Sequence, residues 1–221
     1  TTLNAIAGVW PVDCGQILID GKDISALPEH KRAPYLGRVF QDPMTGTVAD
    51  MEIIENLAIA ARRGKKRGLS WGVKADERFR YRQMLAEFDL GLEDRMSSKV
   101  GLLSGGQRQA ITLLMATIKK PKLLLLDEHT AALDPKTAAK VLELSDKIIA
   151  ENNLTALMVT HNMHDAITHG NRLIMMSDGK IILNISGEEK KNLTVEHLLE
   201  MFEKASGSKI ENDRMLLSKD K

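Results

Sequence analysis

Two acidic residues follow the most apolar run of the sequence. Asp127 and Glu128 come directly after four consecutive leucines, residues 123–126. Such a run predicts a buried strand of a parallel sheet, and open α/β folds bind their ligands at the carboxyl edge of that sheet. We expect Asp127 to bind a magnesium ion near phosphates and Glu128 to polarise an attacking water. The alternative is that both acids only cap the next helix.

A second candidate site is the segment LSGGQ, which runs from Leu103 to Gln107 and precedes a stretch with helical spacing. The backbone amides at the N-terminus of a helix attract anions. Ser104 adds a hydroxyl donor, and the two glycines, Gly105 and Gly106, let a phosphate approach the backbone closely. The alternative is an ordinary helix cap.

Two further polar residues follow apolar strand-like segments. Gln41 comes after LGRVF, and His161 comes after TALMVT. If both segments are parallel strands of the same sheet, both residues lie at the edge that carries Asp127. His161 could then bond a terminal phosphate, and Gln41 could reach the metal or the attacking water. The alternatives are a solvated histidine and an ordinary loop amide.

Gln41, LSGGQ, LLLLDE, ALD and His161 follow one another in this order. In these motifs the chain resembles the ATP-binding cassette (ABC) ATPases, and the resemblance runs from Thr1 to about Glu203. It implies an α/β fold, a P-loop NTPase-like core with a mainly parallel sheet and a helical signature subdomain. We expect the core in residues 1–48 and 107–204, the helical subdomain in 49–106 and a flexible tail in 205–221.

The resemblance also implies a role for each matching residue. Gln41 would touch the magnesium shell and link the nucleotide to the transport partner, and Asp127 would bind the magnesium ion. Glu128 would be the catalytic carboxylate, and His161 the switch histidine. Asp134, in ALD, would lie at the interface between two ATPase subunits. The signature residues would contact the γ-phosphate of ATP bound to the opposite subunit: Ser104, Gly105, Gly106 and Gln107.

The sequence departs from the family in two places. No GxxxxGK[ST] phosphate-binding loop occurs in it, and the opening TTLNAIAG is similar to the helix that follows that loop. We therefore expect Thr1 to lie next to the end of that motif or to be its last hydroxyl residue. The first strand and the phosphate-binding lysine would then lie outside this sequence, and we expect the chain as given to be inactive. His129 stands where the family commonly has proline, and we expect it to tune a loop.

The amino-acid composition limits which classes of protein this chain can belong to. With 221 residues and 43% hydrophobic residues, the chain can bury a core, and its formal charge of +1 supplies no global attraction to nucleic acid. The single cysteine, Cys14, can form no internal disulfide and is expected in the core. No apolar run is long enough to span a membrane.

The resemblance and the composition together predict an ATP-hydrolysing subunit of a membrane transporter, at the cytoplasmic face of the membrane. Its partners would be a transmembrane permease subunit and a second ATPase subunit with ATP between the two. An importer of a small solute such as an amino acid, with a solute-binding protein, fits best. The basic segment Arg62 to Arg67 is either a solvated loop or a contact with lipid headgroups. Two alternatives stay open, an ABC ATPase acting on ribosomes or nucleic acid and a non-catalytic fragment.

Overall fold

The computed structural model describes residues 2–64 and 72–206, and these form two compact units. The first unit runs to Val159 and the second begins at Thr160. Thr1, the end of the basic segment at residues 65–67 and, of the tail predicted at 205–221, residues 207–221 lie outside the described residues. The subdomain boundaries expected at residues 48, 106 and 204 stay predictions.

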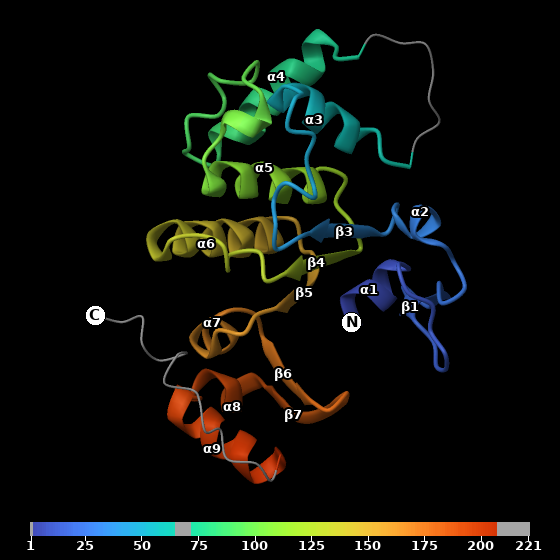
Figure 1. The fold of residues 1–221 in the computed structure, drawn as a ribbon, viewed down its shortest axis with the longest axis vertical. Coiled ribbons are helices and arrows are strands. Elements are labelled where there is room, and N and C mark those ends of the chain that lie inside the picture. Colours follow the sequence, from blue (N-terminus) through green and yellow to red (C-terminus); the bar gives the residue numbers. More distant parts are fainter. Residues whose placement is uncertain (1, 65–71, 207–221) are drawn as a thin grey trace. The chain divides into compact units, whose positions relative to one another are not determined.

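The first unit contains a parallel sheet of three strands, in the order β3 (Leu36–Val39), β4 (Leu123–Asp127) and β5 (Thr155–Val159). Val39 lies opposite Leu126, and Asp127 lies opposite Val159. The three strands therefore end at one edge, as the sequence predicts, and the segments that follow them start from that edge (Figure 1).

Successive leucines of β4 point to opposite faces of the sheet, as the period of a strand requires. Leu124 and Leu126 belong to the large core cluster that includes α5 (Gly105–Thr117) and Ile148 of α6 (Pro135–Glu151). Leu125 packs on the opposite face with Leu3 and Ala7 of α1 (Thr2–Ala7). Helices thus cover both faces of β4, which explains why its residues form a continuous apolar run.

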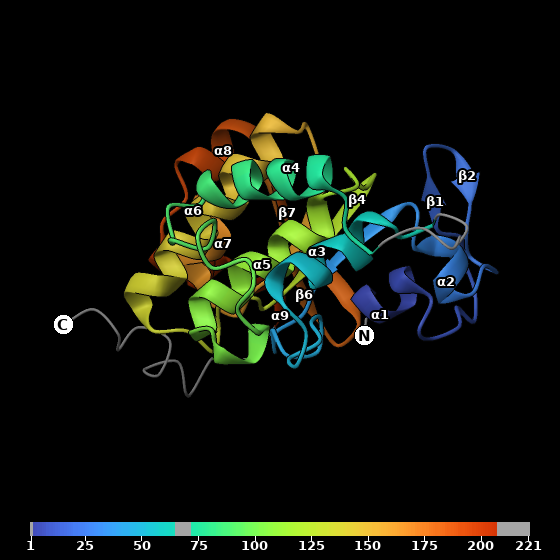
Figure 2. The ribbon, with the colours of Figure 1, turned by 90° about the horizontal axis from the view of Figure 1, so that it is seen from above.

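A helical layer lies on the far side of α5 from the sheet (Figures 1 and 2). It consists of α3 (Ile53–Ala61), α4 (Ala75–Ala86) and the short 3-10 helix η1 (Val100–Leu102). The side chains of Glu52 and Glu55 form a capping box at the start of α3. The stretches at residues 53–61 and 75–86 are therefore helical.

The segment between α1 and β3 holds a two-residue hairpin and the short helix α2 (Glu29–Arg32). The hairpin strands, β1 (Leu18–Ile19) and β2 (Lys22–Asp23), are joined by Asp20 and Gly21, both with positive φ. That backbone is typical of a tight hairpin turn. Cys14 is exposed in this segment, so the prediction that it belongs to the core is wrong.

The described part of the second unit contains five elements: α7 (Met163–Thr168), β6 (Arg172–Ser177), β7 (Lys180–Ser186), α8 (Gly187–Lys191) and α9 (Val195–Ser206). The two strands form an antiparallel hairpin whose turn is Asp178 and Gly179. The second unit has its own apolar cluster, formed by Leu173, Ile185, Leu193 and Leu198. The closing segment is therefore a pair of helices.

The run TALMV forms β5, and none of its residues is fully buried. Among the described strands β5 pairs only with β4. None of the described helices is long and apolar enough to cross a membrane.

Candidate functional site

Glu128 begins the loop that leaves the edge of the sheet after β4. Its backbone N–H donates to the Val159 carbonyl at 3.0 Å, and its own carbonyl accepts from the Ala131 N–H at 3.0 Å. Its φ is 45°, in the left-handed region that non-glycine residues seldom adopt. Such strain is often kept at functional sites. The backbone therefore holds this acid in a defined and costly conformation.

Asp127 lies beside an arginine that the sequence analysis did not single out. The Arg38 Nη2 atom is 3.4 Å from Asp127 Oδ2, and the two side chains are 15% and 35% exposed. The same nitrogen donates to Asn4 Oδ1 of α1 at 2.5 Å, and the guanidinium lies 4.5 Å from the centre of the Phe40 ring. Asp127 is therefore at once exposed to solvent and held by a cation.

Gln41 is exposed, two residues beyond the end of β3. The preceding carbonyl, of Phe40, accepts a hydrogen bond from the Gln109 Nε2 atom at 3.3 Å. Gln109 is fully buried on α5, and its Oε1 atom has no hydrogen-bond partner. A buried amide thus ties the start of the Gln41 loop to the helix that begins with LSGG, a link that no local pattern predicts.

The LSGGQ segment forms a capping box at the start of α5. Ser104 Oγ accepts from the Gln107 N–H at 3.3 Å, and Gln107 Oε1 accepts from the Ser104 N–H at 3.2 Å. Gln107 also donates to the Leu90 carbonyl. The cap, which the sequence leaves as the alternative interpretation, is therefore present, and the Ser104 hydroxyl proton is left to donate elsewhere.

The two glycines of the segment lie in different surroundings. Gly105 is exposed, and a Cβ there would be 3.2 Å from the Leu133 side chain. Gly106 is buried, and a Cβ there would overlap Cγ2 of Thr137. The absence of a side chain at Gly106 is thus required by the close approach of α5 to the first turn of α6.

Asp134, the candidate dimer-interface residue, is the N-cap of α6. Its Oδ1 atom accepts from the Thr137 N–H at 3.1 Å. Hydrogen bonding to Thr137 holds the pKa of the Asp134 carboxyl below its ordinary value. Pro135 takes the first helical position, which needs no N–H donor. Asp134, Gly106 and Ser104 therefore belong to one pair of packed helix starts.

His161 belongs to the second unit, in which it is exposed just before α7. The next residue, Asn162, caps that helix through its Oδ1 atom. Burial raises the pKa of Asp165 above its ordinary value, and the charges of His169, His164 and His161 partly offset that rise. These interactions lie within the second unit, so the proposed action of His161 beside Asp127 stays a prediction.

His129 is buried directly after the two acids and only 2% exposed. Its Nε2 atom is 3.0 Å from Ser145 Oγ of α6. Because that hydroxyl donates to the Val141 carbonyl at 2.8 Å, we assign the shared proton to His129 Nε2. The residue that replaces the common proline thus anchors the loop after Glu128 to α6.

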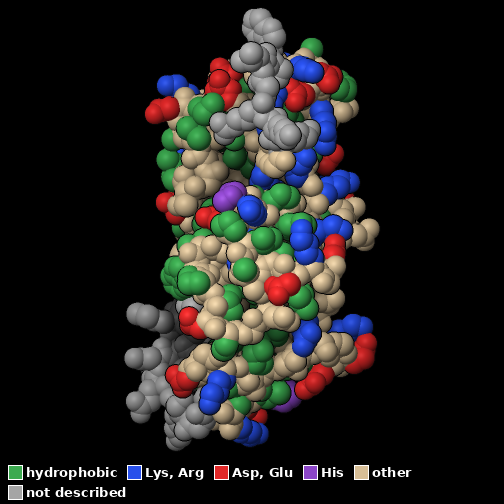
Figure 3. All heavy atoms as spheres, turned by 90° about the vertical axis from the view of Figure 1, so that its right-hand side faces the viewer, with side chains coloured by type: hydrophobic (Ala, Val, Ile, Leu, Met, Phe, Trp, Pro, Cys, Tyr) green, Lys and Arg blue, Asp and Glu red, His purple; other side chains and the backbone are tan. Residues whose placement is uncertain are grey.

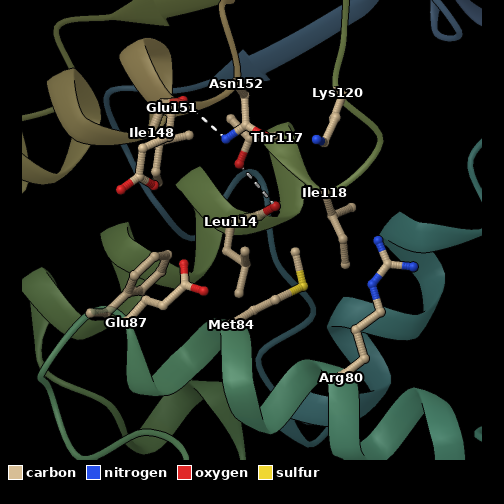
Figure 4. A pocket seen from close by; sticks show the side chains of 11 residues that line it. Arg80, Met84, Glu87, Leu114, Thr117, Ile118, Lys120, Ile148, Glu151 and Asn152 are labelled. Atoms are coloured by element: carbon tan, nitrogen blue, oxygen red, sulfur yellow. Dashed lines mark hydrogen bonds between the residues drawn. The ribbon is translucent and has the colours of Figure 1, made fainter.

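A small hollow of about 70 Å³ lies elsewhere in the first unit, among α4, α5 and the end of α6 (Figure 4). Met84, Leu114 and Ile118 line it with apolar atoms. Lys120 and Asn152, also in its wall, precede β4 and β5, so the hollow lies near the amino ends of those strands and away from Asp127. Ligand pockets typically measure about 300–1,000 Å³, so this hollow is too small for a nucleotide.

Comparison with known proteins places the chain in a family. The sequence profile of the ABC transporter family matches residues 1–131. The "Tyrosine transport ATP-binding protein" of Clostridioides difficile is 46% identical over 93% of this chain and 81% of its own. The "Spermidine/putrescine import ATP-binding protein PotA" of Haemophilus influenzae is 33% identical over 86% of this chain, which spans about half of that relative, 48%.

The solved structures agree. An ATP-binding cassette of an ABC transporter, in its ADP conformation, matches with a TM-score of 0.72 and 27% identity, over 91% of this chain and 81% of that one. The predicted α/β fold of an ABC ATPase, with a parallel sheet and flanking helices, is therefore confirmed. The chain belongs to the ABC transporter family, as an ATP-binding subunit of the ATPase class.

Proposed function

We propose that the native protein hydrolyses ATP to drive the import of an amino acid through a membrane transporter. The observation that carries the proposal is the pair Asp127 and Glu128 at the carboxyl end of β4, where open α/β sheets bind their ligands. Two relatives support the direction and the class of solute. One is named for tyrosine transport, and the other for import of the small amines spermidine and putrescine.

The residues of the first unit fit a magnesium ion held with phosphates. The Asp127 carboxylate is one-third exposed and offers the oxygen ligands that magnesium prefers. Gln41 can add an amide oxygen from the end of the neighbouring strand. Bound magnesium would neutralise charge on the transferred phosphoryl group. Asp127 holds the ion in this proposal, and Gln41 completes its shell and senses the permease.

Glu128 is the proposed catalytic carboxylate. Its backbone is fixed by two hydrogen bonds and by the buried His129 that follows it. A carboxylate fixed in this way can orient a water and accept its proton as the water attacks. His161 supplies a second polar contact to the terminal phosphate in this proposal. Both residues follow strands of the same parallel sheet.

The second half of each nucleotide site comes from another copy of the chain. Ser104 and Gly105 are exposed at the N-terminus of α5, so backbone amides and a hydroxyl are available to the γ-phosphate on that copy. Gln107 and Gly106 shape this turn, and Asp134 lies on the helix packed beside it. Hydrolysis between the two copies would release them, which makes the cycle a mechanical stroke.

The other proposed partners are a transmembrane permease and a solute-binding protein, with this chain at the cytoplasmic face of the membrane. Nucleic acid is not a proposed partner. The formal charge is +1, and the face in Figure 3 carries acidic and basic side chains interspersed. A nucleic-acid-binding surface would instead gather lysine and arginine.

The test is Glu128→Gln in the native protein, with Glu143→Gln, an exposed glutamate of α6, as the matched control. We expect phosphate release to fall at least about a hundredfold and an ATP-bound dimer to accumulate in gel filtration. The control should behave as the wild type. Turnover that is unchanged in Glu128→Gln would refute the assignment.

The substrate is tested by reconstitution with the permease in liposomes. ATP-dependent uptake of labelled tyrosine, lost in Glu128→Gln, is the expected result. Uptake of putrescine and not of any amino acid would contradict the proposed solute. Purification with ribosomes in place of a membrane subunit would contradict transport itself.

A further inference from the structure

Arg38 occupies an unusual position for a cation. It lies on β3 beside β4, on the face of the sheet covered by α1, and its guanidinium reaches the carboxylate proposed to bind a metal ion. A positive charge 3.4 Å from Asp127 Oδ2 opposes the approach of any other cation to that oxygen. Arg38 therefore opposes the binding of a free metal ion at Asp127.

The contacts of Arg38 indicate that its place is fixed. Asn4 Oδ1 and Asp127 Oδ2 both accept from Nη2, and the Phe40 ring lies against the guanidinium. The Nε atom is buried without a hydrogen-bond partner, which costs free energy. The Arg38 side chain stays in place although its Nε–H is unsatisfied. Its contacts with the Asp127 carboxylate and the Asn4 amide hold it there.

The rest of the edge offers few ligands for a free ion. Among the described residues, no group of three or more His, Cys, Asp or Glu side chains is placed to hold a metal ion. The formal charges of Asp127 and Glu128 add to −2, and with Arg38 the formal charge of the three residues is −1. A free divalent cation is repelled by Arg38, whereas a magnesium–ATP complex carries a net negative charge and is attracted by it.

We propose that Arg38 is a positioning residue that makes Asp127 accept a divalent cation together with ATP and not as the free ion. The inference rests on the proposed metal role of Asp127. It assigns to Arg38 the discrimination between free and nucleotide-bound metal. This would keep the edge of the sheet from filling with metal before ATP arrives.

The experiment measures binding of free Mn²⁺, without nucleotide, to the native protein by electron paramagnetic resonance. Arg38→Met and Arg38→Gln both remove the charge, and the glutamine keeps a polar end on its side chain. Each should bind Mn²⁺ about tenfold more tightly than the wild type, because Asp127 is partly exposed and the repulsion is screened. Arg38→Lys keeps the charge and should restore weak binding.

Two controls locate the effect. Arg82→Met removes an arginine from an exposed ion pair with Asp94 in the helical layer and changes the net charge equally, so Mn²⁺ affinity should not change. Asp127→Asn added to Arg38→Met should abolish the gain. Circular dichroism verifies that each variant is folded. The test needs only one of the two neutral variants, Arg38→Met or Arg38→Gln, to fold.

Unchanged or weaker Mn²⁺ binding in a folded neutral variant would overturn the role of Arg38 and leave the metal role of Asp127 standing. A gain that survives Asp127→Asn would overturn both, because the ion would then not be bound by Asp127. A tenfold gain that requires Asp127 and is reversed by lysine supports the inference.

Discussion

The edge of the sheet and the paired starts of α5 and α6 both carry candidate residues, but the structure uses the two groups differently. At the helix starts, four of the five candidates also have a structural contact. Ser104 and Gln107 cap α5, Gly106 makes room for Thr137, and Asp134 caps α6. At the edge, Asp127 is one-third exposed and Glu128 has a positive φ. A variant at the helix starts can therefore lose activity through a lost structural contact. A variant at the edge of the sheet that loses activity has lost a proposed catalytic or metal-binding group.

The largest effect we expect is at the edge. Asp127→Asn in the native protein should lower ATP turnover at least about a hundredfold, because it removes a charge from the proposed metal ligand. The free energy of unfolding should change by no more than about 1 kcal/mol, because the ion pair with Arg38 is partly exposed. Phosphate release and urea unfolding measure the two quantities. If Asp127→Asn lowered the free energy of unfolding by several kcal/mol and kept normal turnover, Asp127 would be a structural residue and the comparison would be wrong.

The next effect is at the helix starts and is one of stability. Gly106→Ala should lower the free energy of unfolding by about 2 kcal/mol, because its Cβ would overlap Thr137 Cγ2. Gly105→Ala is the matched control and should cost less, since it meets only the movable end of Leu133. Combining Gly106→Ala with Thr137→Ser should recover part of the loss in a double-mutant cycle. Equal costs for the two glycines would contradict the packing argument.

These two regions also show what can be predicted from sequence. The acids at the end of β4 and the hairpin at Asp178 and Gly179 follow from local patterns, since an apolar run or a turn pair is contained in a few residues. The ion pair between Arg38 and Asp127 joins residues 89 positions apart, and Gly106 meets Thr137 on another helix. No local pattern encodes such contacts.

Burial is the second quantity that the sequence predicts poorly. Cys14 is apolar enough for a core but exposed. His129, expected to tune a loop, is buried and pairs with Ser145 on α6. Residue type alone predicts neither outcome.

A smaller effect separates the two functions proposed for Ser104. Ser104→Ala should cost about 1 kcal/mol of stability through loss of the cap. Ser104→Asp should keep the stability, because aspartate caps helices well, but its charge should repel a phosphate and prevent ATP-dependent dimerisation. Urea unfolding and gel filtration with ATP compare the variants. Normal dimerisation of Ser104→Asp would show that Ser104 is only a cap.

The smallest effect is the contribution of Asp134 to acid stability. Hydrogen bonding to Thr137 lowers the pKa of Asp134 in the folded protein, so folding favours the ionised form. That contribution is fully present above the carboxyl's unfolded pKa and is lost as the pH falls through the lower folded value. Asp134→Asn keeps a cap that cannot ionise. The difference in unfolding free energy between the wild type and Asp134→Asn should therefore shrink as the pH falls below about 4. A difference that is constant with pH would mean that the cap at α6 acts through its shape and not its charge.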